Sequence, residues 1–377
     1  MRIALVAGEA SGDLLGAGLI EEIRALVPAA TFEGVAGPAM QAAGCERIED
    51  ADALAVMGLI EPLKEIPRLL RLRRGLVERW RNEPPDVFVG IDAPDFNFGL
   101  EKALRDAGIP VVHYVSPSIW AWRSGRIKTV QNAVDRVLCI LPFEKAIYDE
   151  HDVDAVFVGH PKADSLPTDI DTDAAKADLG LAGHPVVAVL PGSRRNEVKR
   201  LGPIFAAATA LLAEQDATLR FVTPSASAAL RPLIEQQLLA AGVRERFCIV
   251  DDDSIGAMSA ADVVLLASGT AALESALLCK PTVAAYKVSE LSARIFQLFR
   301  LIKTPYVTLP NLLTEEPLIP ELIQWAVTPE ALAREVAELL QDAQRRASIS
   351  SEFAKLRTKL ALDADKRAAK AVVEIAT

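Results

Sequence analysis

The stretch that decides the fold is Val263–Glu274, which reads VVLLASGTAALE. It opens with an apolar run suited to a buried strand and ends in a run of helix formers. The turn between them holds Ser268, Gly269 and Thr270, whose backbone N–H groups can reach an anion at the positive end of a helix. Glu274 follows one helical turn later, where a carboxylate can accept hydrogen bonds from a sugar. The stretch therefore predicts a strand–turn–helix unit, which either binds a nucleotide-sugar at its turn or merely carries a Ser/Thr helix cap.

A second unit of the same kind lies earlier in the chain. Pro185–Leu190 is apolar and predicts a buried strand, and the turn after it contains Gly192, Ser193 and Arg194. The glycine permits a close backbone approach, the serine can cap the next helix, and the arginine offers a planar fork to phosphate oxygens. Two such turns in one half of the chain indicate a diphosphate site.

Strands and helices are expected to alternate along the whole chain, and 377 residues suit two domains better than one. Strands are expected at Ile3–Ala7, Thr31–Val35, Val87–Ile91, Val111–Val115, Arg136–Ile140, Ala155–Val158, Val186–Leu190, Leu219–Val222, Cys248–Val250, Val263–Leu266 and Thr282–Ala285. Helices are expected between them, notably at Leu14–Leu26, Leu63–Asn82 and Leu100–Ala107. This order predicts an α/β protein with two Rossmann-like, doubly wound parallel-sheet domains, at 1–160 and 161–345, that face each other across a cleft.

Composition argues against several classes of protein. The net charge of −10 disfavours a nucleic-acid-binding protein, which usually carries a basic surplus. The four cysteines are widely spaced and the four histidines form no ligand pair, so we expect reduced thiols, no metal site and no cofactor. The chain begins with a buried strand rather than a signal peptide, and it has no uncharged apolar stretch of roughly 18 residues. We therefore expect a cytoplasmic protein that does not span a membrane.

Two loops that follow strands of the first half carry candidate site residues. Gly8–Asp13 reads GEASGD; its glycines do not match the G-x-G-x-x-G spacing of a dehydrogenase, and Ser11 either contacts a ligand or caps a helix. The strand Val87–Ile91 runs into Asp92, which is expected at the carboxyl edge of the sheet and is our candidate general base. The alternative, an Asx-turn that orders the loop, fits the nearby Asp95 better.

An aromatic segment follows the strand expected at Val111–Val115. Trp120 and Trp122 suit contact with a sugar or an acyl chain there, although tryptophan more often fills a core. His113 lies inside the strand itself and is expected to be a buried core histidine.

The segment Leu59–Leu76 is unusual for a soluble surface. Its apolar positions alternate with four arginines, and they are Leu59, Ile60, Leu63, Ile66, Leu69, Leu70 and Leu72. A basic amphipathic segment of this kind can lie on an anionic membrane surface. The alternative is a helix that packs on the sheet by its leucines and leaves its arginines in water. The density of arginine in an acidic protein favours membrane contact.

Several of these strings together resemble the lipid A disaccharide synthases, the family-19 glycosyltransferases. The matching strings are Val6–Asp13, Val35–Pro38, Gly90–Asn97, His113–Arg123, Leu141–Glu144, Leu190–Arg194, Ala267–Glu274 and Tyr306–Leu313. They cover essentially the whole chain, and the departures are small, such as Arg195-Asn196 after the Pro-Gly-Ser-Arg string.

The resemblance implies the GT-B architecture and an inverting transfer. Diacylglucosamine would pass from UDP-2,3-diacylglucosamine to the 6-hydroxyl of 2,3-diacylglucosamine 1-phosphate (lipid X), giving a β(1→6) disaccharide 1-phosphate and UDP. Asp92 would take the proton of the attacking hydroxyl, without a metal. The resemblance assigns the donor to Arg194, Ser268, Gly269, Thr270, Glu274 and Asn311, and the acceptor to Ser11 beside Asp92. We add Gly192 and Ser193 to the expected donor residues, and Gly12, Trp120 and Trp122 to the expected acceptor residues.

The resemblance also implies peripheral association with the cytoplasmic face of the inner membrane, and a homodimer in some members. A helical tail at 346–377 would pack on an N-terminal domain, its own or a partner's. Two alternatives stay open. Another GT-B enzyme, such as a UDP-GlcNAc 2-epimerase or a glycosyltransferase with a soluble acceptor, would share both anion turns. A non-catalytic nucleotide-sugar-binding membrane protein would keep them as well, but would have no need of Asp92.

Overall fold

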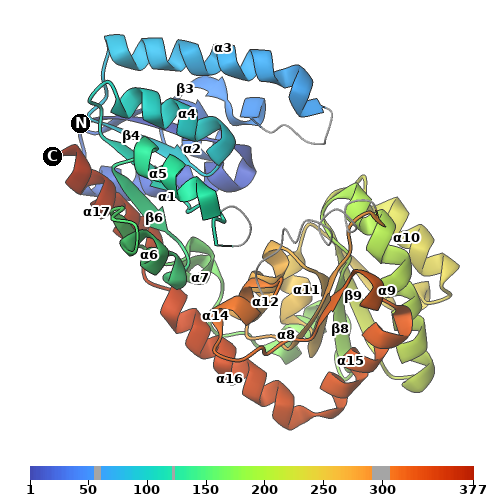
Figure 1. Cartoon of the computed structure of the whole chain (residues 1–377). Coiled ribbons are helices and arrows are strands. Elements are labelled where there is room, and N and C mark those ends of the chain that lie inside the picture. Colours follow the sequence, from blue (N-terminus) through green and yellow to red (C-terminus); the bar gives the residue numbers. More distant parts are fainter. Residues whose placement is uncertain (55–60, 121–123, 291–305) are drawn as a thin grey trace. The chain divides into compact units, whose positions relative to one another are not determined.

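The computed structural model describes residues 1–54, 61–120, 124–290 and 306–377. The chain divides into two compact units (Figure 1). The first unit comprises Met1–Asp164 and Leu360–Thr377, and the second comprises Ser165–Lys359. The last helix of the chain therefore belongs to the same unit as the first strand.

The first unit is built on a parallel sheet with the strand order β3-β2-β1-β4-β5-β6-β7. Its strands are β1 (Arg2–Ala7), β2 (Thr31–Ala36), β3 (Cys45–Asp50), β4 (Val87–Ile91), β5 (Val111–Tyr114), β6 (Arg136–Cys139) and β7 (Ala155–Phe157). The central strands β1 and β4 are buried along almost their whole length, as expected for a parallel sheet covered on both faces. Six of these strands are predicted from sequence; β3 was missed because its CERIED sequence is polar and half-exposed at the sheet's edge.

Helices cover both faces of this first sheet. They are α1 (Glu9–Leu26), α2 (Pro38–Ala42), α3 (Glu61–Asn82), α4 (Pro94–Arg105), α5 (Ile127–Ala133), α6 (Pro142–Asp149), α7 (Pro161–Ser165) and α17 (Ala364–Ala376), with 3-10 turns η1 (Ala51–Leu54) and η2 (Ser124–Arg126). One core lies between the sheet and α1 with α17. The other lies between the opposite face and α3, α4, α5 and α6, and it contains the fully buried Trp80 of α3.

The second unit has a sheet of the order β10-β9-β8-β11-β12-β13, again parallel throughout its described pairs. Its strands are β8 (Val186–Leu190), β9 (Arg220–Ser225), β10 (Phe247–Asp251), β11 (Val263–Ala267), β12 (Thr282–Tyr286) and β13 (Glu321–Ile323). Its helices are α8 (Thr172–Asp178), α9 (Arg195–Gln215), α10 (Arg231–Ala240), α11 (Ser254–Ser259), α12 (Thr270–Leu277), α14 (Leu309–Leu313), α15 (Pro329–Gln341) and α16 (Ala343–Leu360), with η3 (Arg244–Arg246) and η4 (Gln324–Ala326). The three-residue β13 is too short to be predicted from the alternation of residues.

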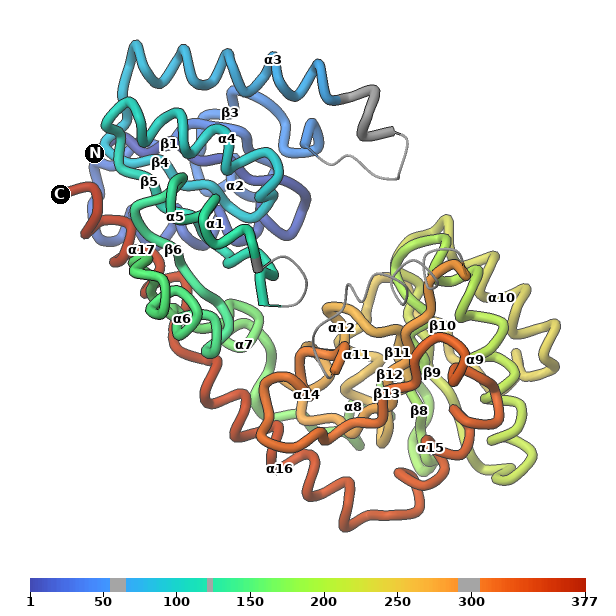
Figure 2. Tube along the Cα trace, in the orientation of Figure 1, coloured from blue at the N-terminus to red at the C-terminus, as the bar shows by residue number. Residues whose placement is uncertain are grey.

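The C-terminal part of the chain returns to the first unit at Leu360, later than the boundary expected at residue 346. The guanidinium of Arg357, on α16, donates to the carbonyl oxygens of Pro167 (2.6 Å) and Leu277 (3.0 Å), which anchors this helix in the second unit. Helix α17 packs on the first unit, beside α1 (Figure 2). Its Ala368 and Val372 belong to the core on that face of the sheet. Within the described ranges, no helix is both long and apolar enough to cross a bilayer.

Candidate functional site

A cavity of about 370 Å³ opens at the carboxyl ends of β8 and β11 in the second unit. Seven of the eight residues expected to hold the donor line it, namely Gly192, Ser193, Arg194, Ser268, Gly269, Thr270 and Glu274. Both strands end in apolar residues, and a short turn joins each to a helix, α9 or α12, whose first turn faces the cavity. The helix macrodipoles therefore present their positive ends, and the N–H groups of their first turns, to whatever occupies it.

Gly192 allows the turn after β8 to close. Its φ of +120° lies in a region that side chains rarely adopt. A Cβ atom at this position would come within 2.6 Å of Glu197 Oε2. The glycine is therefore required by the backbone as well as by the space in front of it.

Arg194 is well placed to meet an anion. Its side chain is 69% exposed and contacts Glu197 through a 3.4 Å Nη1–Oε1 pair. Such an exposed pair contributes little to stability, so the guanidinium can leave it for a phosphate. Sequence reasoning missed Glu197, Asp252 and Ser254, which also line the cavity. The carboxylate-rich DDDS string at 251–254, which begins at the last residue of β10, was the available signal for the last two.

Asn311 does not line this cavity. It is almost fully buried, and its amide nitrogen donates to Ile319 O (2.9 Å) and Glu321 Oε1 (2.8 Å). Its amide oxygen accepts hydrogen bonds from the backbone N–H groups of Leu318 (2.9 Å) and Ile319 (3.0 Å). The side chain fixes the loop that leads into β13.

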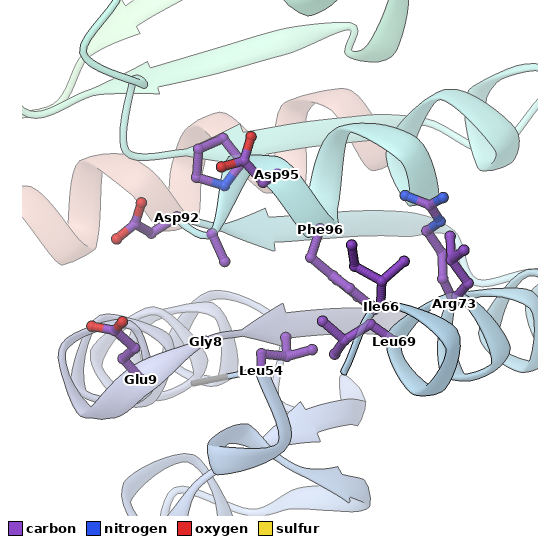
Figure 3. Close-up of a pocket in the computed structure, with 12 residues that line it drawn as sticks. Gly8, Glu9, Leu54, Ile66, Leu69, Arg73, Asp92, Asp95 and Phe96 are labelled. Carbon is purple, nitrogen blue, oxygen red and sulfur yellow. The ribbon is translucent and has the colours of Figure 1, made fainter. Parts of the chain in front are cut away.

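A pocket of about 570 Å³ lies in the first unit and contains Asp92 (Figure 3). Four parts of the chain line it: Gly8 and Glu9 at the start of α1, Leu54, the α3 residues Ile66, Leu69, Leu70 and Arg73, and Asp92 to Phe96 at the start of α4. Figure 3 shows the carboxylates of Glu9 and Asp92 toward one end, the Arg73 guanidinium toward the other, and apolar side chains between them. The pocket thus combines a candidate base, an apolar wall and a cation.

The backbone around Asp92 is tightly held. Asp92 and Ala93 both have positive φ values, +49° and +44°, which is uncommon for residues other than glycine. The buried Asn97 donates from Nδ2 to the Asp92 carbonyl oxygen at 2.8 Å, and the Asp92 N–H donates to Tyr114 O at 2.8 Å. These bonds fix the turn and leave the Asp92 side chain half-exposed at the pocket.

The first loop contributes a different residue from the one expected. Ser11 is exposed and Gly12 is buried, and neither lines the pocket. Glu9 does line it, and it has a φ of +64°. Strain of this kind in a non-glycine residue is typical of functional sites, and sequence reasoning missed it.

Trp120 contacts a buried carboxylate rather than the pocket. Its indole N–H donates to Glu144 Oε1 at 3.3 Å, and its ring meets Phe143 edge-on at 5.2 Å between centroids. Burial raises the pKa of Glu144 to about 7, although hydrogen bonds from Leu141 N–H and Trp120 oppose the shift. Trp122 lies outside the described residues.

His113 is a core residue, as predicted. It is fully buried, and its Nδ1 lies 2.6 Å from an oxygen of the equally buried Glu101.

Of the apolar side chains of the amphipathic segment Leu59–Leu76, some pack on the protein and others are exposed to solvent. Leu69 and Leu72 pack against the core of the first unit, whereas Ile66 and Leu70 are 43% and 36% exposed. Leu63 belongs to α3, and Leu59 and Ile60 lie outside the described residues. In the described part of the chain, no cluster of three or more His, Cys, Asp or Glu side chains could hold a metal ion.

Comparison with known proteins identifies the family. Residues 3–376 match the sequence model of the lipid-A-disaccharide synthetases. The chain belongs to this family. It is 48% identical to the lipid-A-disaccharide synthase of Alkalilimnicola ehrlichii over all of this chain and 99% of that one, and 47% identical to that of Hahella chejuensis over all of this chain and 94% of that one.

Solved structures of low sequence identity confirm the fold. A putative UDP-N-acetylglucosamine 2-epimerase from Listeria monocytogenes has a TM-score of 0.65 at 15% identity, covering 99% of this chain and 94% of that one. Anabaena HepE in complex with UDP has a TM-score of 0.63 at 14% identity, covering 99% and 100%. This member of the synthetase family therefore has the two Rossmann-like parallel-sheet units of the GT-B fold, as predicted from its sequence.

Proposed function

We propose that the chain is an inverting glycosyltransferase of lipid A biosynthesis. It condenses UDP-2,3-diacylglucosamine with 2,3-diacylglucosamine 1-phosphate to give the β(1→6) disaccharide 1-phosphate and UDP. The observation that carries this assignment is the full-length identity of nearly half with lipid-A-disaccharide synthases. Two features of the structure support it, the helix-terminus cavity of the second unit and the carboxylate pocket of the first.

The cavity of the second unit takes the UDP moiety of the donor. Negative charge grows on the diphosphate as the bond to the anomeric carbon breaks. The N–H groups at the starts of α9 and α12 oppose that charge without having to reorganise, and Arg194 adds a cation once its guanidinium leaves Glu197. Each donor directed at the leaving group is worth about 3 kcal/mol of transition-state stabilisation. Glu274 accepts hydrogen bonds from sugar hydroxyls.

The pocket of the first unit takes the acceptor. Asp92 removes the proton of the attacking 6-hydroxyl, for which a positioned base contributes roughly 10²- to 10⁴-fold in rate. Ile66, Leu69 and Leu70 offer an apolar surface to acyl chains. Peripheral association with the cytoplasmic face of the inner membrane is part of the proposal, and the exposed Ile66 and Leu70, among the arginines of α3, support contact with a membrane surface.

The apolar wall beside Asp92 favours an acylated acceptor over a soluble one. A UDP-GlcNAc 2-epimerase needs no such surface, and the likeness to epimerase structures at 15% identity concerns the fold alone.

The test is to incubate the purified protein with UDP-2,3-diacylglucosamine and 2,3-diacylglucosamine 1-phosphate and to follow products by mass spectrometry. We expect UDP and the disaccharide 1-phosphate in equal amounts. Epimerised UDP-GlcNAc in a parallel incubation, with no disaccharide in the first, would instead establish the epimerase alternative. Binding of UDP without either product would indicate a non-catalytic protein.

A further inference from the structure

The cation at the far end of the first unit's pocket has no role in the reaction as described so far. Arg73 lines the pocket and is half-buried. Among the residues that the structure describes, none forms a hydrogen bond or an ion pair with it. A half-buried guanidinium without a partner loses hydration and gains nothing in return. The position is therefore better explained by a ligand than by stability.

The surrounding arginines behave differently. Arg68 donates to the carbonyl oxygen of Ala53, and Arg79 pairs with Glu33 at 2.8 Å. Arg126, near the same pocket, pairs with Asp95. Arg74, next to Arg73 on α3, is exposed and lies outside the pocket lining. Arg73 thus combines a pocket position with donors that are available to an incoming group.

Helix α4 makes room for this guanidinium at Gly99. A methyl group on Gly99 would overlap Arg73 Nη1 and would lie 2.7 Å from Arg73 Cζ. The guanidinium is therefore held against the bare backbone of α4, on the side of α3 that faces Asp92 and Phe96 (Figure 3). Gly99 lies five residues beyond Pro94, or about 7.5 Å along the helix axis. A ligand that reaches both Arg73 and Asp92 must carry its two polar groups at opposite ends.

We propose that Arg73 binds the phosphate monoester of the acceptor, while the acceptor's hydroxyl is at Asp92 and its acyl chains lie on the apolar wall between them. This inference rests on the proposed function, because it assigns the acceptor to this pocket. The planar guanidinium matches phosphate oxygens with two parallel hydrogen bonds, which a lysine cannot reproduce. Arg73 is thus a specificity residue: it selects a phosphorylated amphiphile and does not touch the reacting atoms.

The experiment compares two acceptors on two proteins, the wild type and Arg73→Gln. One acceptor is 2,3-diacylglucosamine 1-phosphate and the other is the same lipid without its phosphate, both in neutral detergent micelles. A charge-assisted hydrogen bond of this kind corresponds to about 10- to 100-fold in affinity. We expect Arg73→Gln to raise the KM of the phosphorylated acceptor by that factor, to leave kcat within a few-fold, and to leave the KM of the dephosphorylated acceptor almost unchanged.

Three further variants separate phosphate recognition from other effects. Arg74→Gln removes a charge from the same helix outside the pocket and should match the wild type in micelles. Arg73→Lys should recover only part of the preference, since it keeps the charge and loses the fork. Gly99→Ala should mimic Arg73→Gln, because its methyl group displaces the guanidinium without removing the charge.

A binding measurement keeps the inference separate from the reaction. The affinity of each acceptor is measured by calorimetry in the absence of donor. Failure of the wild type to form disaccharide would overturn the proposed function, whereas phosphate-dependent binding that Arg73→Gln abolishes would still support the role of Arg73. Equal discrimination between the acceptors by wild type and Arg73→Gln would overturn the inference. Equal losses in Arg73→Gln and Arg74→Gln would also overturn it, and would assign both to general attraction for anionic surfaces.

Discussion

The two candidate sites are built in opposite ways. The cavity of the second unit is made mainly from short turns, PGSR and SGT, in which a strand, a glycine and a helix start follow one another within a few residues. The pocket of the first unit brings together four segments that are far apart in the sequence, and its character comes from side chains. Backbone sites can be recognised locally, whereas side-chain sites depend on tertiary packing. Substitutions should therefore act differently on the two.

The largest effect is expected from Asp92→Asn. Asparagine tolerates the positive φ of this position better than most residues, so the turn and its bond to Asn97 should persist. Loss of the base should lower kcat by roughly 10²- to 10⁴-fold while UDP still binds. Steady-state kinetics and UDP calorimetry measure the two quantities.

Two carboxylate controls define the role of Asp92. Asp95→Asn alters a carboxylate that already pairs with Arg126 and should reduce kcat far less. Glu9→Gln tests the other carboxylate at the same end of the pocket. Turnover close to that of the wild type in Asp92→Asn, together with a large loss in Glu9→Gln, would transfer the role of base to Glu9.

The next largest effect is expected in the cavity of the second unit, which is formed mainly by backbone turns. Gly269→Ala tests one of these turns without disturbing the fold. Gly269 has an extended φ of 171° and no atom within 4 Å of the position of an added Cβ, so alanine should leave the fold intact. If the diphosphate approaches this turn, the methyl group should weaken UDP binding by about 10-fold or more, the equivalent of about 1.4 kcal/mol. Calorimetry measures the affinity and thermal unfolding measures the stability.

Gly192→Ala is the matched contrast. Its positive φ and the nearby Glu197 carboxylate make alanine strained there, so both stability and UDP affinity should fall. Unaltered UDP affinity in Gly269→Ala would show that the diphosphate does not contact the turn at 268–270.

The sequence predicted the backbone site almost completely, and the pocket only in part. The turns at Gly192 and Gly269 were recognised because glycine, small hydroxyl residues and a strand-to-helix change occur together in the chain. Asp92 was found for a similar reason, since it follows a strand directly. Glu9 was missed because its importance depends on a positive φ and on the proximity of α4, neither of which leaves a local pattern.

The amphipathic segment shows the same limit at the level of packing. Its period predicted a helix, and α3 is one. The sequence could not tell which leucines face the protein, because Leu69 and Leu72 pack on the core while Leu70 is partly exposed. Asn311 was expected among the donor residues because of the resemblance alone. In the structure both atoms of its amide are hydrogen-bonded within a loop, so it does not line the cavity.

A smaller effect is expected on stability, from Glu144, which contacts Trp120 outside the pocket of the first unit. Glu144 is buried and its pKa is raised to about 7, so between its ordinary pKa and 7 the folded protein holds a proton that the unfolded chain releases. The contribution of that proton to the free energy of unfolding is therefore present at low pH, and it is lost as the pH rises through 7. Glu144→Gln does not titrate, so relative to the wild type it should become more stable by on the order of 3 kcal/mol between pH 4.5 and pH 8.

Urea unfolding followed by tryptophan fluorescence tests this pH dependence. Turnover of Glu144→Gln should stay within a few-fold of the wild type, because neither Glu144 nor Trp120 lines the pocket. A parallel pH dependence for variant and wild type would contradict the raised pKa. A large rise in the acceptor KM would extend the site to Trp120.

The smallest effect is expected from Leu70→Ser, which asks whether the partly exposed face of α3 serves the pocket or the membrane. Partial loss of one leucine contact is worth about 1 kcal/mol, or about fivefold. Because Leu70 lines the pocket, we expect the KM of the acylated acceptor to rise by that factor in detergent micelles, where no bilayer is present. Leu239→Ser, which removes a leucine that is 64% exposed in the second unit, should leave it unchanged. A loss by Leu70→Ser that appears only as weaker sedimentation with anionic vesicles would assign Leu70 to the membrane surface, and the apolar surface of the pocket would then consist of Ile66 and Leu69.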